Sequence, residues 1–135
     1  MKTFALLGDP TFNESRPASE ALLGDQHHRI LRFCLKPDQV VPEHLAPPDS
    51  AAIMIVLSGK GLCSGGDGQE IPIAAQDMVI FDPGEAHAIK ALDQELVFIV
   101  ILSGVAGNHE AAMAHQRPIR GKPAHHEWGS RVAQA

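Results

Sequence analysis

Two histidines, His44 and His87, combine the residue type and the surroundings that favour chemistry in this chain. His44 stands in the segment VVPEHLAPP and His87 in the segment FDPGEAHAI, each where a strand-like pattern meets turn-forming residues. A neutral imidazole can coordinate a divalent ion or exchange hydrogen bonds with a small molecule. The question for the rest of the sequence is which fold would bring these two segments together.

Apolar residues recur with a period of two through most of the first hundred positions, which predicts β-strands. A glycine-rich turn at 65–68 indicates a tight hairpin, because such turns need positive φ. Short strands with turn residues about every ten positions favour an all-β barrel or sandwich. The predicted strands cover residues 29–36, 39–44, 52–58, 61–64, 69–73, 78–81, 87–91 and 96–102.

Two of these segments, 52–57 and 96–102, are apolar without interruption. A strand with one wet face should alternate, so both are expected to be covered on two sides. One side faces the interior of the barrel. A second copy of the chain is the simplest cover for the other side, which predicts a homodimer. The alternative is that terminal segments of the same chain fold over these strands.

Length, charge and cysteine content limit the class of protein. The 135 residues suit one domain, and the net charge of −5 argues against nucleic-acid binding. No segment is long and apolar enough for a membrane span or a signal peptide. Cys34 and Cys63 lie in apolar strands and are expected to be buried and reduced, so we expect a soluble cytoplasmic protein that binds neither nucleic acid nor membrane.

Three parts follow along the chain. Residues 1–27 look like an irregular N-terminal arm, and residues 28–103 hold the predicted strands. Residues 104–135 contain a short helix predicted over 109–116, followed by a tail with little periodicity.

With its motifs in this order, residues 28–103 resemble a single-domain member of the cupin superfamily. The resemblance implies a double-stranded β-helix, or jelly-roll barrel, flanked here by short N- and C-terminal arms. It also implies a pocket at the barrel mouth where His44 and His87 point inward. The matching positions are Pro42, His44, Gly59 and Gly61 in the first motif, and Asp77, Pro83, Gly84 and His87 in the second.

The chain departs from the family pattern at the metal ligands. A second histidine is expected two residues after His44, and Ala46 stands there instead; a glutamate expected soon after is replaced by Asp49, Ser50 and Ala51. Strict alternation would put Val40, Pro42, His44 and Ala46 on one face, and Glu43 on the other. Two imidazoles are fewer than the three protein ligands of typical catalytic zinc or non-haem iron sites.

Three interpretations stay open. The first is a protein that binds a small molecule at the barrel mouth. The second is a metal-dependent enzyme, of oxygenase, isomerase or lyase type, with a divalent Fe, Mn, Ni or Zn ion on His44 and His87 and a bound water or substrate completing the shell. A carboxylate ligand would have to come from Glu43, Asp49 or Glu85. The third is a structural scaffold. The predicted pocket residues are His44, His87, Phe33, Met54, Phe81 and Phe98.

Overall fold

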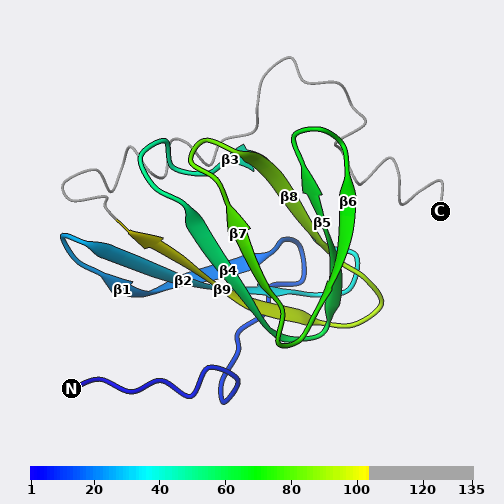
Figure 1. Cartoon of the computed structure of the whole chain (residues 1–135). Coiled ribbons are helices and arrows are strands. Elements are labelled where there is room, and N and C mark those ends of the chain that lie inside the picture. The colour runs from blue at the N-terminus through cyan, green and yellow to red at the C-terminus, as the bar shows by residue number, and fades with distance from the viewer. Residues whose placement is uncertain (104–135) are drawn as a thin grey trace.

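Alternating side chains and frequent turn residues produce an all-β fold in the computed structural model, which describes residues 1–103 (Figure 1). Within these residues no helix is long and apolar enough to cross a membrane. The predicted short helix over 109–116 lies outside the described residues. The strands are β1 (Ala18–Gly24), β2 (His28–Leu35), β3 (Val40–Leu45), β4 (Ala52–Ser58), β5 (Lys60–Gly65), β6 (Glu70–Ala74), β7 (Met78–Phe81), β8 (Ala86–Ala91) and β9 (Leu96–Ser103).

The strands form two antiparallel sheets that face each other. One sheet has five strands in the order β1-β2-β9-β4-β7, and the other has four in the order β3-β8-β5-β6. The chain crosses repeatedly from one sheet to the other, which is the winding of a double-stranded β-helix. All eight strands predicted from the periodicity are present, and the all-β barrel is confirmed.

The core lies between the two sheets. Its largest fully buried side chains come from the inner faces of β2, β4 and β9, where every second residue points inward. Direct cross-strand partners such as Phe33 and Phe98 stack there, with ring centroids 5.0 Å apart. The core cluster includes Leu35, Met54, Val56, Leu96, Phe98 and Leu102.

The N-terminal region differs from the irregular arm expected over residues 1–27. Residues Ala18–Gly24 form β1, an edge strand that pairs antiparallel with β2. Periodicity did not predict this strand because its side chains are mostly exposed and it has little apolar alternation. The remaining arm lies along the outer side of the five-stranded sheet, where Arg32 donates hydrogen bonds to the Leu6 carbonyl and the Asp9 carboxylate.

The passage from β4 to β5, between the sheets, requires a glycine. Gly59 has φ of +90°, and a Cβ placed there would lie 2.0 Å from the Glu95 carbonyl oxygen. Gly84, in the turn before β8, also has positive φ, +73°, but nothing lies within 4 Å of its Cβ position. A side chain at position 59 would thus meet both backbone strain and steric overlap, whereas one at position 84 would meet backbone strain alone.

We expect Gly59→Ala to lower the free energy of unfolding by at least about 3 kcal/mol, since strain and overlap act together. Gly84→Ala is the matched control and should cost about 1–2 kcal/mol, from strain alone. Guanidinium unfolding of both variants measures the difference. Equal losses would show that the contact with the Glu95 carbonyl does not constrain the crossover.

Candidate functional site

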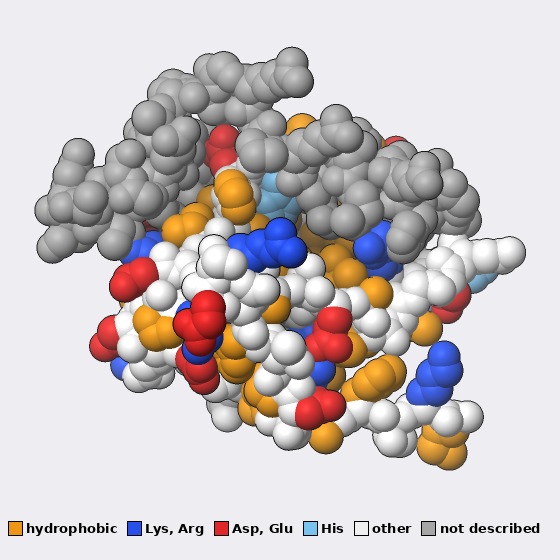
Figure 2. Space-filling view, turned by 180° about the vertical axis from the view of Figure 1, so that it is seen from behind, with side chains coloured by type: hydrophobic (Ala, Val, Ile, Leu, Met, Phe, Trp, Pro, Cys, Tyr) orange, Lys and Arg blue, Asp and Glu red, His pale blue; other side chains and the backbone are white. Residues whose placement is uncertain are grey.

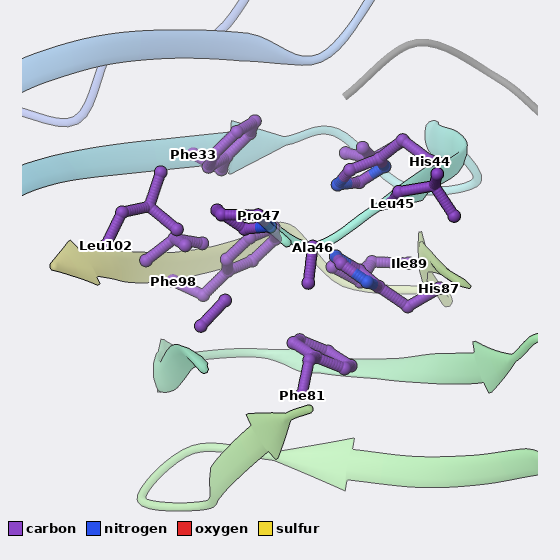
Figure 3. A pocket seen from close by; sticks show the side chains of 13 residues that line it. Phe33, His44, Leu45, Ala46, Pro47, Phe81, His87, Ile89, Phe98 and Leu102 are labelled. Carbon is purple, nitrogen blue, oxygen red and sulfur yellow. The ribbon is translucent and has the colours of Figure 1, made fainter. Parts of the chain in front are cut away.

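His44 and His87 lie side by side on neighbouring strands of the four-stranded sheet. They are direct cross-strand partners in the antiparallel pairing of β3 with β8. Their ring centroids are 4.2 Å apart and the ring planes meet at 64°. Figure 3 shows both rings extending from their strands into the same space, next to Ala46. Residues 43 positions apart in the sequence therefore form one site.

Backbone carbonyls fix the tautomer of both rings. His44 Nδ1 lies 2.8 Å from the Pro42 oxygen, and His87 Nδ1 lies 3.1 Å from the Glu85 oxygen. Because a carbonyl oxygen can only accept, each Nδ1 carries the proton and donates it. Each Nε2 is then left with a lone pair, so the two rings together offer two acceptors or two metal-binding nitrogens.

Both rings are held in the neutral form. Burial lowers the pKa of His87 to about 3, with a further decrease from the neighbouring His44, while the hydrogen bond to Glu85 acts in the opposite direction. Burial also lowers the pKa of His44, against the hydrogen bond to Pro42. Near neutral pH, then, the site carries no positive charge from its imidazoles.

An aromatic ring covers one face of His87. Phe81, from the end of β7 in the opposite sheet, stacks on the imidazole with centroids 3.8 Å apart and planes within 10°. Phe81 is 4% exposed and His87 is 5% exposed. Packing on one face and the carbonyl bond at Nδ1 leave His87 a single orientation.

The two histidines line an apolar recess between the sheets. The recess has a cavity volume of about 20 Å³, and about 390 Å³ of empty space when its open mouth is counted. His87 lies at the buried floor, whereas His44 is partly exposed at the rim. The lining residues are Phe33, Val41, His44, Leu45, Ala46, Pro47, Ala52, Phe81, His87, Ile89, Phe98, Val100 and Leu102 (Figure 3).

The structure brings five of the six predicted pocket residues together: His44, His87, Phe33, Phe81 and Phe98 all line the recess. Met54 does not. Its side chain points inward from β4 but is fully buried in the core. It lies two residues farther along β4 than the lining residue Ala52. An inward orientation alone therefore does not tell whether a residue lines the recess or the core.

A β-bulge corrects the predicted face of β3. The register shifts between Val41, which pairs with Ile89, and His44, which pairs with His87. Three steps along β3 therefore match two along β8, and Val41 lines the recess in place of Val40. Pro42 lies in this bulge and has no N–H to donate to the neighbouring strand. Its presence in the sequence was therefore the signal that the pairing of this strand is interrupted.

The described residues do not supply a complete set of metal ligands. Residues 1–103 contain no group of three or more His, Cys, Asp or Glu side chains placed to hold an ion. Ala46, 2% exposed, lines the recess where the family pattern would put a histidine. Glu43 and Asp49 do not line it, and Glu85 accepts a hydrogen bond from the Asp82 N–H. Among residues 1–103 the site therefore offers an ion two nitrogen donors.

The comparisons with known proteins agree with this fold. The model of the cupin domain matches residues 31–104. No curated protein matches the chain. Similar solved structures include an RmlC-like cupin from Desulfovibrio desulfuricans, with 24% identity, 75% of this chain and 95% of that chain covered, and a TM-score of 0.69.

Two further structures have the same fold. One is a conserved protein with a double-stranded β-helix domain from Klebsiella pneumoniae, with 18% identity, coverage of 76% and 90%, and a TM-score of 0.71. The other is a predicted oxalate decarboxylase from Thermotoga maritima, with 25% identity, coverage of 64% and 79%, and a TM-score of 0.59. At these identities the structural likeness establishes the double-stranded β-helix.

Neutral buried histidines make stability depend on pH. The folded pKa of His87, about 3, lies below its ordinary value of 6.5, so the unfolded chain binds the proton more tightly. Its stabilising effect is complete above pH 6.5 and is lost as the pH falls from 6.5 toward 3. We expect His87 alone to remove roughly 1.5 kcal/mol between pH 6.5 and pH 5.

Urea unfolding of wild type and His87→Gln at several pH values tests this expectation. The variant should show a shallower loss of stability over the same range, whatever its stability at pH 7. An unchanged slope in His87→Gln would mean that His87 binds its proton equally tightly in the folded and the unfolded chain.

Proposed function

The chain belongs to the cupin superfamily, and from this premise we propose that it binds a small, mainly apolar organic molecule with hydroxyl or N–H donors in the recess around His44 and His87. The observation that supports the proposal is the pair of Nε2 lone pairs, which are fixed by the carbonyl bonds at Nδ1. Two neighbouring acceptors in an apolar recess are best satisfied by donors on the ligand.

The charge of the lining argues against a strongly anionic ligand. Among the described lining residues none is Lys or Arg, and both histidines have lowered pKa values. A carboxylate brought into such a site would lose its hydration without gaining a cation. A dicarboxylate such as oxalate, which the description of the Thermotoga maritima protein suggests for that protein, is therefore disfavoured here.

The shape of the recess favours a ring. Two stacked pairs of rings, Phe33 with Phe98 and Phe81 with His87, belong to the lining. The cavity volume of the recess holds about one water molecule. A ring-sized ligand would therefore displace a partly exposed rim residue such as Leu45, while the carbonyl bonds at Nδ1 keep His44 and His87 in place.

Catechol and its dimethyl ether, 1,2-dimethoxybenzene, are matched probes for this proposal. We expect catechol to bind with a dissociation constant about tenfold or more below that of the ether, since each lost hydrogen bond costs about 1 kcal/mol. Chemical shifts in a ¹H–¹⁵N NMR titration measure both constants. Equal affinities, or no saturable shift at the recess, would contradict the proposal.

Protein variants separate the acceptors from the apolar surface. His44→Leu keeps much of the side-chain volume but removes the lone pair, so it should weaken catechol and leave the ether nearly unchanged. His28→Leu, an exposed histidine at the start of β2, is the control and should affect neither probe. Equal weakening of both probes by His44→Leu would indicate a change of shape only.

The alternative function is that of a metal-dependent enzyme. One observation favours it: in metal sites a histidine commonly donates its second N–H to a carbonyl, as both histidines do here. Against it stands the missing third donor among residues 1–103. This alternative needs a ligand from outside that range or from the substrate.

Metal titration distinguishes the two functions. If the protein binds a small organic molecule without a metal, adding Fe(II), Mn(II), Ni(II) or Zn(II) to chelator-treated protein leaves the melting temperature within about 1 °C of its metal-free value. A larger rise means that an ion binds the folded state, because stabilisation grows with [L]/Kd. If that rise disappears in both His44→Leu and His87→Gln, the enzyme alternative replaces our proposal.

The location that we propose is the cytoplasm. Cys34 and Cys63 are both free and buried, on separate sheets. Burial raises the pKa of the Cys63 thiol to about 12, so it stays protonated. Unreactive free thiols suit a reducing compartment.

A further inference from the structure

A single arginine interrupts the apolar inner face of β2. Phe33 lines the recess, and alternation along the strand puts Arg29, Leu31 and Leu35 on the same face. Arg29 is 6% exposed, and burial lowers the pKa of its guanidinium from the ordinary value. Burying a guanidinium is costly unless acceptors satisfy it, and such departures from the pattern of a core strand are expected at functional positions.

The register of β2 with β9 places Arg29 at the edge of the recess. Arg29 is not itself part of the lining, but its direct partner on β9 is Leu102, which is. Side chains directly opposite each other in an antiparallel pair have Cβ atoms about 5 Å apart. The next pair outward, His28 with Ser103, is exposed. Arg29 therefore lies between the recess and solvent, at the mouth.

The other side of Arg29 is open. Its partner on β1 is Gly24, which has no side chain, and nothing lies within 4 Å of the position that a Cβ would take there. A guanidinium carries five N–H donors in a planar fork. Arg29 can therefore bind a ligand group in this space while it keeps the contacts that it has within the protein.

The recess extends along β9 between this mouth and the stacked rings of Phe33 and Phe98. Phe98, Val100 and Leu102 are successive inward residues of β9 that line it, and Phe98 and Leu102 lie roughly 13 Å apart along the strand. A ligand with its ring beside Phe98 and a short chain on that ring would bring the end of the chain to Leu102, and so to Arg29.

We propose that Arg29 forms a second subsite at the mouth of the recess and binds a carboxylate of the ligand, while the ring and the hydroxyl donors of that ligand occupy the interior. This inference rests on the function proposed above and narrows it to ring acids, with hydroxyl or N–H donors at one end and a carboxylate at the other. The uncharged lining disfavours a carboxylate inside the recess only. At the mouth the guanidinium can hold it through two parallel N–H···O bonds.

Charge favours a carboxylate over a phosphate monoester at this subsite. A phosphate monoester carries about −1.5 to −2 at pH 7, whereas Arg29 supplies one positive charge and the described lining residues supply none. On the face that Figure 2 shows, Lys and Arg side chains stand among acidic and apolar ones and form no basic cluster. The net charge of −5 on the chain also repels the more highly charged ligand more strongly.

Dihydrocaffeic acid, which is catechol extended by a propanoate chain, and its primary amide are matched probes for this subsite. We expect the acid to bind wild type with a dissociation constant about tenfold or more below that of the amide, because charge-assisted hydrogen bonds are roughly twice as strong as neutral ones. A ¹H–¹⁵N NMR titration measures both constants, and the Nε–H signal of Arg29 should shift as the acid saturates. Equal constants overturn the inference and leave the proposed function standing. If neither probe binds, both fail.

Variants separate the subsite from the overall charge of the chain. Arg29→Gln should bring the acid to the affinity of the amide and change the constant of the amide less than about twofold. Arg16→Gln is the matched control, since it removes the same charge from an exposed arginine before β1, and it should keep the wild-type preference. Arg29→Lys keeps the charge without the planar fork and should retain part of the preference.

Two results with these variants overturn the subsite: a full preference for the acid in Arg29→Gln, or an equal loss of preference in Arg16→Gln and Arg29→Gln. A melting curve shows whether Arg29→Gln folds. If it does not fold, the Arg29 signal of wild type decides, because a signal that stays unmoved while the acid saturates also overturns the subsite.

Discussion

The antiparallel register of β3 with β8 is the constraint on which the site depends. It places His44 directly opposite His87 and lets each Nδ1 reach a carbonyl two residues earlier on its own segment. The bulge at Pro42 is part of that register, since without it the alternation along β3 would bring Val40 to the inner face in place of Val41. The position of the two lone pairs follows from backbone hydrogen bonding, before any ligand is considered.

Desolvation of the two imidazoles then decides their charge, and with it the ligands that they can bind. The opposite sheet contributes Phe33, Phe81 and Phe98 to the lining, Phe81 stacks on His87, and burial keeps both imidazoles neutral. A neutral imidazole with a fixed Nδ1–H is a hydrogen-bond acceptor and cannot pair with an anion. The departure from the family pattern at Ala46 points the same way, because a methyl group there extends the apolar lining next to two nitrogens.

Both faces of the five-stranded sheet are apolar along β4 and β9. Even-numbered residues of β4 and β9 face the core and the recess, and odd-numbered residues lie on the outer face of the sheet. This is why both strands are apolar without interruption. Cover by a terminal segment of the same chain was one of the two expectations for these strands. It holds at the β2 end of the outer face, where the N-terminal arm contacts Arg32. The homodimer remains a proposal for the β7 end.

Local sequence information was sufficient for the strands, the cupin fold and the pairing of His44 with His87, because period-two alternation, turn glycines and motif order are properties of short segments. It also located Phe33, Phe81 and Phe98. It missed β1, the bulge at Pro42 and the exclusion of Met54 from the recess, each of which depends on register between segments far apart in the chain. The tautomer and the neutrality of the two histidines were likewise decided by tertiary structure, since they depend on which carbonyl or ring lies against a given side chain.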